Sequence, residues 1–155
     1  VGRLVAEGLD VVGLIVGGED PKRPGYAKEI RERVQAEGLG ERIVFTGHRS
    51  DVREISAISD CVLSLSSTPE SFGRTVLEPL AMGRPVVGYA HGGVAEILGE
   101  LFPHGAVAKG DVVAASQCTL ATLRGETPTV SFNTRFLLEH MQARTIELYR
   151  YLNPA

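Results

Sequence analysis

Residues 66–93 read SSTPESFGRTVLEPLAMGRPVVGYAHGG, and this stretch contains the pattern that indicates the fold. A loop rich in Ser, Pro and Gly leads into TVLEPLAMG, which predicts a helix over 75–83 closed by Gly83. The β-branched run RPVVGYA then predicts a strand over 84–90, and CVLSLSS before the loop predicts another over 61–67. Strand, helix and strand in this order predict two parallel strands joined by a helical crossover.

The same alternation extends along the chain in both directions. Apolar runs predict further strands over 11–20 and 42–47 and an extended segment near 101–107, and the run at 11–20 is typical of a buried parallel strand. Helical spacing predicts the remaining elements, over 26–37, 51–59, 93–98, 111–123 and 133–152. We therefore predict an α/β fold, a Rossmann-like doubly wound parallel sheet. Residues 1–132 would form the domain, and 133–155 a C-terminal helix that packs on it or crosses toward another lobe.

The first residues fit this fold poorly. VGRL predicts a strand, but the next strand begins by Val11 or Val12, which leaves about six residues for a connection. A parallel crossover needs a dozen or more residues. Either the first strand is not parallel to the second, or a loop and helix are omitted after Leu4. We favour the omission and expect a break in the chain between Leu4 and Val5.

The bulk composition excludes several classes of protein. A chain of 155 residues with 43% hydrophobic and 23% charged residues is expected to form one globular domain. A net charge of −3 gives no reason to expect nucleic-acid binding, and neither a transmembrane run nor a signal peptide is visible. Cys61 and Cys118 show no metal-binding spacing, so we expect Cys61 to be a buried free thiol and the compartment to be the reducing cytoplasm.

Ligands of doubly wound folds bind outside the carboxyl ends of the strands. The loops to expect there are rich in Gly, Ser, Pro or His, and they span 17–25, 47–50, 66–74 and 90–94. In the third loop, Gly73 allows a close backbone approach, and the N–H groups that open the following helix form an anion site. Glu70 precedes that helix and Glu78 lies about one turn inside it, so the two carboxylates would flank one ligand.

A purely structural interpretation of both carboxylates is open as well. Thr75-x-x-Glu78 fits a capping box, in which Glu78 satisfies a backbone N–H at the helix start. Pro79 favours a helix that begins near Thr75, because proline is best tolerated near the first turn. Glu70 would then be a solvated loop acid.

The segment PESFGRTVLEPLAMGRPVVG resembles the E-x7-E signature of retaining glycosyltransferases with the GT-B fold, the large family-4-like group. FTG at 45–47, DCVLSLSS before the signature and AMGRPVVGYAHGGVAEIL after it extend the resemblance, which covers 11–107 almost continuously. GRL at 2–4 resembles the opening strand of the donor-binding lobe in the same family.

The resemblance implies a role for each matching residue. Glu70 would lie beside the donor sugar, Glu78 would accept the ribose hydroxyls, and Arg3 would contact the diphosphate, with Glu70 and Arg3 as the catalytic pair. The other donor-binding residues that it implies are Phe72, Gly73, Arg74, Thr75, Val76, Leu77, Gly92 and Gly93. A lysine that usually follows GRL in a Lys-Gly pair has no counterpart in VAEGLD.

The activity implied by the resemblance is transfer of a hexosyl unit from a nucleoside-diphosphate sugar, with retention, to a glycan, lipid or small-molecule acceptor. The donor is a substrate, so no cofactor is expected, and the lack of a DxD motif favours a site without metal. The acceptor lobe would be a second, N-terminal domain, and any peripheral membrane association would come through that lobe. Two alternatives stay open, a lobe of a nucleotide-sugar epimerase and a non-catalytic module that binds sugar nucleotides or glycans.

Overall fold

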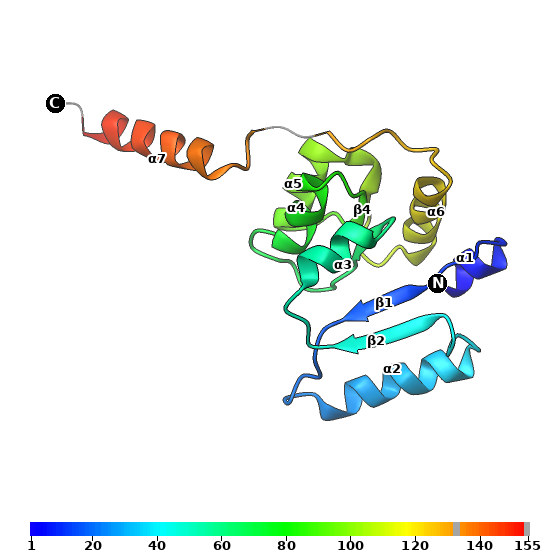
Figure 1. Ribbon diagram of the computed structural model, residues 1–155. Helices are drawn as coiled ribbons and strands as arrows, with labels where there is room; N and C mark the ends of the chain where they lie inside the picture. Colours follow the sequence, from blue (N-terminus) through cyan, green and yellow to red (C-terminus); the bar gives the residue numbers. More distant parts are fainter. Residues whose placement is uncertain (132–133, 154–155) are drawn as a thin grey trace.

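The computed structural model of the protein describes residues 1–131 and 134–153 and shows alternating helices and parallel strands (Figure 1). The N-terminal part contains α1 (Gly2–Ala6), β1 (Gly13–Val16), α2 (Pro24–Ala36), β2 (Ile43–Gly47) and α3 (Val52–Ile58). The middle part contains β3 (Val62–Ser64), α4 (Arg74–Ala81), β4 (Val86–Tyr89), α5 (Gly93–Leu101), a 3-10 turn (Pro103–Gly105) and β5 (Ala106–Val107). Two helices follow, α6 (Val112–Leu123) and α7 (Leu138–Leu152). The order of elements predicted from 11–123 is confirmed, with ends that differ by a few residues.

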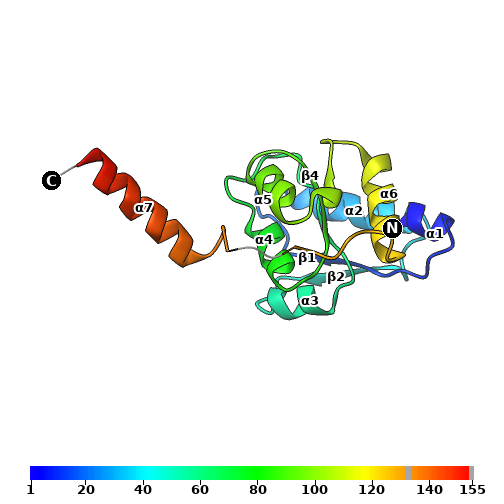
Figure 2. The same cartoon turned by 90° about the horizontal axis from the view of Figure 1, so that it is seen from above.

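Strands β3, β4 and β5 form a parallel sheet in that order, and its central strand is buried on both faces. Val86 packs on one face in a cluster completed by residues of α4, α5 and the segment after them: Val76, Leu80, Val94, Ile97, Leu98, Leu101 and Phe102. Val87 and Tyr89 pack on the other face with Val107 and with Ala115 of α6. Helices therefore cover both faces of this sheet, as the doubly wound fold predicts (Figure 2).

These two clusters contain most of the fully buried apolar side chains, and they hold the middle of the chain together. Phe102 has the largest fully buried side chain, and Leu80, Ile97 and Leu98 are also almost completely shielded from water. Burial of a side chain of this size contributes about 1.5–3 kcal/mol to stability. Because α4 and α5 supply most of these side chains, the loops that open the two helices are fixed to the core of the domain.

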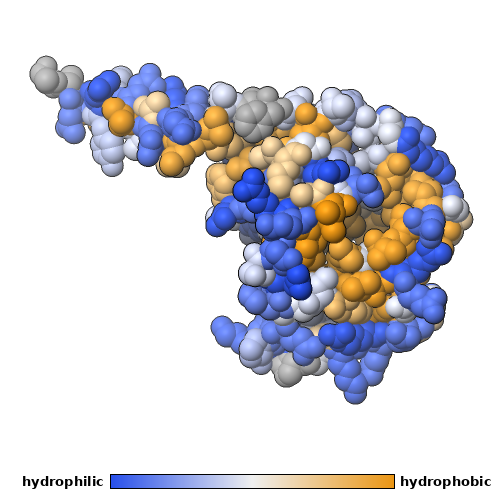
Figure 3. Space-filling model, viewed as in Figure 1, coloured by the Kyte–Doolittle hydropathy of each residue, from blue (hydrophilic) through white to orange (hydrophobic). Residues whose placement is uncertain are grey.

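Strands β1 and β2 pair in parallel but form a separate two-stranded sheet. Helix α2 covers this pair, where Val34 is buried and the Arg31 guanidinium lies 4.4 Å from the Phe45 ring centre. Several of the strand side chains stay exposed, namely Leu14, Ile15, Val16 and Val44. Figure 3 shows apolar surface gathered in the hollow beside this sheet. The prediction of a buried strand within one continuous sheet is wrong here, because the two sheets do not share a hydrogen-bonded edge.

The first residues form a short helix, and both predictions made for them are wrong. Val5 N–H donates to the Val1 carbonyl at 3.0 Å, so the chain runs without a break through Leu4 and Val5. Leu4 is buried, and α1 lies beside α6 (Figure 1). A helix satisfies its own backbone groups, whereas a strand here would need a parallel partner that the short connection to β1 cannot deliver.

The C-terminal helix extends away from the rest of the chain in both ribbon views (Figures 1 and 2). None of its residues is buried, although Phe136 just before it packs against the cluster around Val86. It begins at Leu138, later than expected, and the expected domain boundary at 132–133 lies outside the described residues. Across the described ranges, none of the helices combines the length and the apolar character that a membrane span requires.

Candidate functional site

The loop between β3 and α4 carries the first acid of the predicted site. Ser66 Oγ donates to the Thr68 carbonyl at 2.9 Å, which folds the start of this loop into a local turn. Gly73 then takes the N-cap position of α4 with a φ of +96°. Only glycine adopts this left-handed conformation without strain, and it turns the chain so that Glu70 lies directly before the helix.

Glu70 is half-buried and is held through both its side chain and its backbone. Thr75 Oγ1, at the second helical position of α4, lies 3.3 and 3.2 Å from the two carboxylate oxygens and donates to them. The Glu70 carbonyl accepts a hydrogen bond of 2.9 Å from the N–H of Gly93 at the start of α5. Glu70 is therefore an oriented acid between two helix starts and not a freely solvated one.

Glu78 lies one turn further along α4, on its outer face. The side chain is 48% exposed, and its Oε1 accepts from the Arg74 guanidinium, with Nε at 2.8 Å and the terminal nitrogen at 2.7 Å. The capping-box interpretation fails, because Gly73 is the N-cap and the start of α4 has no side-chain cap. Val76, Pro79 and Leu80 are the residues of α4 that face the core. This leaves Glu78 and Arg74 facing outward.

The backbone N–H groups at the start of α4 divide into two kinds. Those of Val76 and Leu77 both donate to the Gly73 carbonyl at 3.0 Å, so they are already occupied. Those of Arg74 and Thr75 make no hydrogen bond within 1–131 and 134–153. An anion at this helix start would therefore meet the Arg74 and Thr75 amides first, and the N-terminal end of the helix dipole favours negative charge there.

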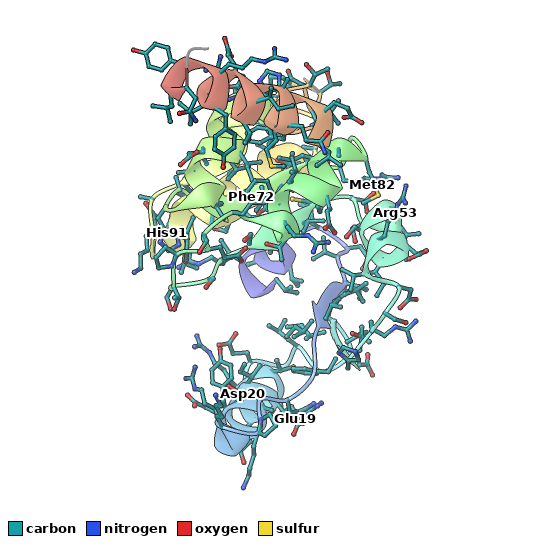
Figure 4. All side chains as sticks on the ribbon, turned by 90° about the vertical axis from the view of Figure 1, so that its left-hand side faces the viewer. Glu19, Asp20, Arg53, Phe72, Met82 and His91 are labelled. Atoms are coloured by element: carbon teal, nitrogen blue, oxygen red, sulfur yellow. The ribbon has the colours of Figure 1, made fainter. Side chains whose placement is uncertain are left out.

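The four loops expected at the ligand-binding edge come together in two pairs. Loop 66–74 lies against loop 90–94, where His91 Nε2 is 3.0 Å from the Ser66 carbonyl and must carry the proton that it donates. Loop 17–25 lies against 47–50, joined by the hydrogen bond from Gly17 N–H to the Gly47 carbonyl at 3.0 Å. In Figure 4 Phe72 and His91 belong to one of these pairs, and Glu19 and Asp20 to the other.

Arg3 is not brought to Glu70. It lines a pocket of about 190 Å³ between α1 and α6, with Glu7 and with Ser116 and Gln117 of α6. Arg3 belongs to the short helix α1 and not to the expected strand, and its contact with the diphosphate stays a prediction. The structure therefore assembles the predicted donor-binding residues of loops 66–74 and 90–94 and leaves Arg3 outside them.

Three contacts of the site were not predicted from the sequence. The Arg74–Glu78 pair was readable, because oppositely charged residues at i and i+4 meet on a helix. The bond between Thr75 and Glu70 depends on the turn at Gly73, and that between His91 and Ser66 joins residues that are 25 positions apart. Neither leaves a local signal in the sequence.

The described residues also include no cluster of three or more His, Cys, Asp or Glu side chains placed to hold a metal ion. Cys61 and Cys118 are both free thiols and both partly buried, so the expectation for Cys61 is confirmed for its free state and only in part for its burial. Burial raises the pKa of Cys61 to about 12. Both thiols pack against the cluster of Val87, Tyr89, Val107 and Ala115, and not at the loops around Glu70.

The fold is shared with solved glycosyltransferase structures. Anabaena Alr3699/HepE in complex with UDP-glucose superimposes with a TM-score of 0.69 and 28% identity, covering 81% of this chain and 35% of that protein. A glycosyltransferase from Rickettsia africae superimposes with a TM-score of 0.73 over 99% of this chain and 43% of its own, and its 22% identity shows the fold alone. These likenesses confirm the α/β, Rossmann-like lobe of the GT-B fold.

Two curated relatives match at the sequence level. A 2-deoxystreptamine N-acetyl-D-glucosaminyltransferase of Streptomyces fradiae is 37% identical over 105 residues, 66% of this chain and 24% of the relative. A 2-deoxystreptamine glucosyltransferase of Streptomyces kanamyceticus is 29% identical over 133 residues, 84% of this chain and 33% of the relative. The chain thus spans between about a quarter and a third of these relatives. The family model of glycosyl transferases group 1 matches residues 3–120, and the chain belongs to this family.

Proposed function

We propose that the chain is the donor-binding lobe of a retaining glycosyltransferase that transfers a hexosyl unit from a nucleoside-diphosphate sugar. The observation that carries this proposal is the pair Glu70 and Glu78 on either side of the start of α4, with the Arg74 and Thr75 amides between them. The named activities of the two Streptomyces relatives and the UDP-glucose bound to the Anabaena protein support the choice of donor.

In this proposal the start of α4 receives the diphosphate. Its free N–H groups and its dipole favour negative charge, and that charge grows on the leaving diphosphate as the glycosidic bond breaks. Preorganised donors of this kind stabilise the transition state more than the ground state, so they accelerate the reaction. Catalysis by this lobe would be electrostatic, without a metal ion.

Glu70 and Glu78 have different roles in the proposed site. Glu70 lies on the loop side of the helix start and is oriented by Thr75, so we assign it to the donor sugar. Glu78 lies one turn along, where its carboxylate can accept the two ribose hydroxyls after it exchanges its bond to Arg74. Phe72 is 51% exposed at the same loop and offers an apolar ring beside the sugar.

The acceptor would bind to a second, N-terminal lobe, and α7 would contact that lobe. Apolar side chains of α7 are exposed on a helix that buries nothing against this domain; they include Leu138, Met141, Leu148, Tyr149 and Leu152. Exposed apolar stripes of this length usually mark an interface. We propose that α7 crosses to the acceptor lobe.

A thermal-shift titration tests the proposed function. A ligand that binds only the folded state raises its stability by about 2.7 kcal/mol at one hundred times its Kd. UDP, GDP or ADP should therefore raise the unfolding temperature of the chain, and EDTA should not change the shift. Turnover of the matching nucleotide sugar by the whole protein, with the anomeric configuration of the product read by NMR, tests retention. No shift with any nucleoside diphosphate would contradict the proposal.

A further inference from the structure

We propose that Gly93 is a positioning residue for Glu70. Its N–H and its missing side chain set the distance between the loop before α4 and the start of α5. This inference rests on the proposed function, since the position of Glu70 matters only if a donor sugar binds beside it. The family resemblance implies that Gly92 and Gly93 bind the donor. In the structure their backbone also contacts the Glu70 loop.

The space at Gly93 is already filled by the loop. A Cβ built on Gly93 would lie 2.1 Å from the Phe72 carbonyl oxygen, 2.5 Å from its carbon and 2.7 Å from the Phe72 Cα. These atoms are backbone, so they cannot rotate away as a flexible side chain would. Ordinary van der Waals contact begins near 3.4 Å, so an added methyl group requires the Phe72 carbonyl to withdraw by more than 1 Å.

Gly92 contacts the same loop one residue earlier. Its φ is +57°, and a Cβ there would lie 2.6 Å from the Glu70 carbonyl oxygen and 3.1 Å from Pro69 Cβ. That carbonyl is the acceptor for the Gly93 N–H at 2.9 Å. The two glycines therefore combine one hydrogen bond with two close backbone contacts, and all three involve residues 69–72.

A third glycine, Gly73, packs the end of the loop that joins α4 against α5. Gly73 packs over Val94 and Ile97, since a Cβ added to it would lie 3.3 Å from Val94 Cγ2 and 3.4 Å from Ile97 Cδ1. Val94 and Ile97 are almost fully buried in the cluster shared by α4 and α5. The start of α5 thus forms a rigid surface against which both the Glu70 loop and the start of α4 are placed.

Small displacements at this surface should affect catalysis strongly. Glu70 is fixed from α5 through its carbonyl and from α4 through the Thr75 hydroxyl, so a shift of the loop moves the carboxylate relative to the amides of α4. A misplacement of about 1 Å costs roughly a hundredfold in rate when the reacting groups are otherwise correctly held. Gly93 does not need to touch the substrate in order to control the reaction.

The chain contains a matched control for this test. Gly99 lies in the same helix as Gly93 and is exposed, and a Cβ added to it would meet no atom within 4 Å beyond the nearby backbone of its own helix. Gly93→Ala and Gly99→Ala add the same methyl group to α5, but only the first meets the Glu70 loop. The difference between the two variants therefore isolates the contact with the loop from the effect of alanine on the helix.

Both variants are made in the whole protein that contains this chain, and amide hydrogen exchange is measured by mass spectrometry. In Gly93→Ala, residues 66–76 should exchange at least about tenfold faster than in the wild type, while α6 stays unchanged and Gly99→Ala matches the wild type. With the donor sugar, kcat should fall by about ten- to a hundredfold, whereas the Kd of the sugar-free nucleoside diphosphate stays within about threefold.

A double-mutant cycle distinguishes positioning from a general loss of structure. If Gly93 acts through Glu70, the Glu70→Gln change should lower kcat much less in the Gly93→Ala background than in the wild type. Additive effects, or unchanged exchange in residues 66–76, would overturn the inference. Should Gly93→Ala fail to fold, Gly92→Ala, whose nearest contact is the Glu70 carbonyl oxygen, is put through the same measurements.

Failure of the proposed function gives a different result. A wild-type protein that binds no nucleoside diphosphate and transfers no sugar refutes the donor-binding role, whatever the exchange data show. A wild-type protein that turns over donor while Gly93→Ala behaves like Gly99→Ala refutes only the positioning role of Gly93.

Discussion

The Thr75 hydroxyl lies within 3.3 Å of both carboxylate oxygens of Glu70, so the second residue of α4 orients an acid that precedes the helix. This contact crosses the Gly73 turn and makes the loop and the helix start one unit. A hydrogen bond to a charged group contributes about 1.5–3 kcal/mol when it is well formed, and less at these longer distances. The orientation of Glu70 is therefore sensitive to a single hydroxyl group.

Replacing Thr75 with Val removes that hydroxyl and keeps the shape of the side chain. Because Glu70 then loses its side-chain donor, we expect kcat of the whole protein to fall by about three- to tenfold, in line with roughly 1 kcal/mol. The unfolding temperature should barely change, since Thr75 is exposed. Steady-state kinetics and a thermal melt measure both. Thr75→Ser keeps the hydroxyl and should retain most of the activity; equal losses in both variants would contradict the role of the hydrogen bond.

Substitutions of Glu70 and Glu78 should have different effects on nucleoside-diphosphate affinity. Glu78→Ala should weaken nucleoside-diphosphate binding by about ten- to a hundredfold, because a charged acceptor for the ribose is lost. Glu70→Gln should leave that affinity within about threefold and lower turnover of the whole protein instead. Calorimetric titration of the nucleotide into wild type and variants measures the first effect, and a transfer assay the second. Equal losses of affinity in both variants would mean that the roles are assigned wrongly.

Cys61 should make stability depend on pH in the alkaline range. Burial raises its pKa from 9.0 to about 12, so above pH 9 the unfolded chain ionises this thiol while the folded chain keeps it protonated. The stability that this difference provides is complete below pH 9 and is lost as the pH rises toward 12. The loss should not exceed about 1.4 kcal/mol per pH unit for one proton.

Denaturant melts of wild type and Cys61→Ala between pH 8 and pH 10.5 measure this dependence. The variant should be less sensitive to pH over this range, and Cys118→Ala serves as the comparison because burial raises the pKa of that thiol as well. In the folded wild type, iodoacetamide should modify Cys61 only slowly at neutral pH, since the thiolate is the reactive form. Parallel curves for wild type and Cys61→Ala would show that the thiol is not shielded.

Removing α7 should leave the domain intact. A chain that ends at Leu137 loses a helix without buried residues, so its unfolding temperature should stay within about 2 °C of the full chain. Phe136→Ala in the shortened chain is the control and should cost about 1–3 kcal/mol, because Phe136 packs against the central cluster. Differential scanning calorimetry compares the three. A large loss on truncation alone would show that α7 does pack on this domain.

Much of the fold was predictable because its local signals agree with one another. Glycine is common just after a helix end, and Gly38 follows α2 with a φ of +67°. Aspartate is a preferred N-cap residue, and Asp51 occupies the N-cap position of α3, although its carboxylate pairs with Arg49 instead of the helix backbone. Gly73 and the two glutamates were placed around one helix start because strand, glycine and helix follow each other within a few residues.

The rest depended on distant partners. The VGRL segment has the composition of a strand, but a strand forms only where another strand pairs with it, and the short connection to β1 leaves a helix as the self-sufficient alternative. The position of Arg3 follows from that change, because Arg3 lies in α1 beside α6. The contact between Gly93 and Phe72 was also out of reach, because a distance between two backbones does not appear in either local sequence.

The separation of the sheets has a consequence for how the chain behaves at high concentration. Strands at the margin of a sheet present unpaired amide and carbonyl groups, and a flat apolar margin serves as a template for other chains. The β1–β2 pair has such margins, and its apolar side chains stay open to water. The edges of β1 and β2 should therefore pair with strands of other copies at high concentration. Dilute solution, a domain that covers these edges, or a chaperone should prevent this aggregation.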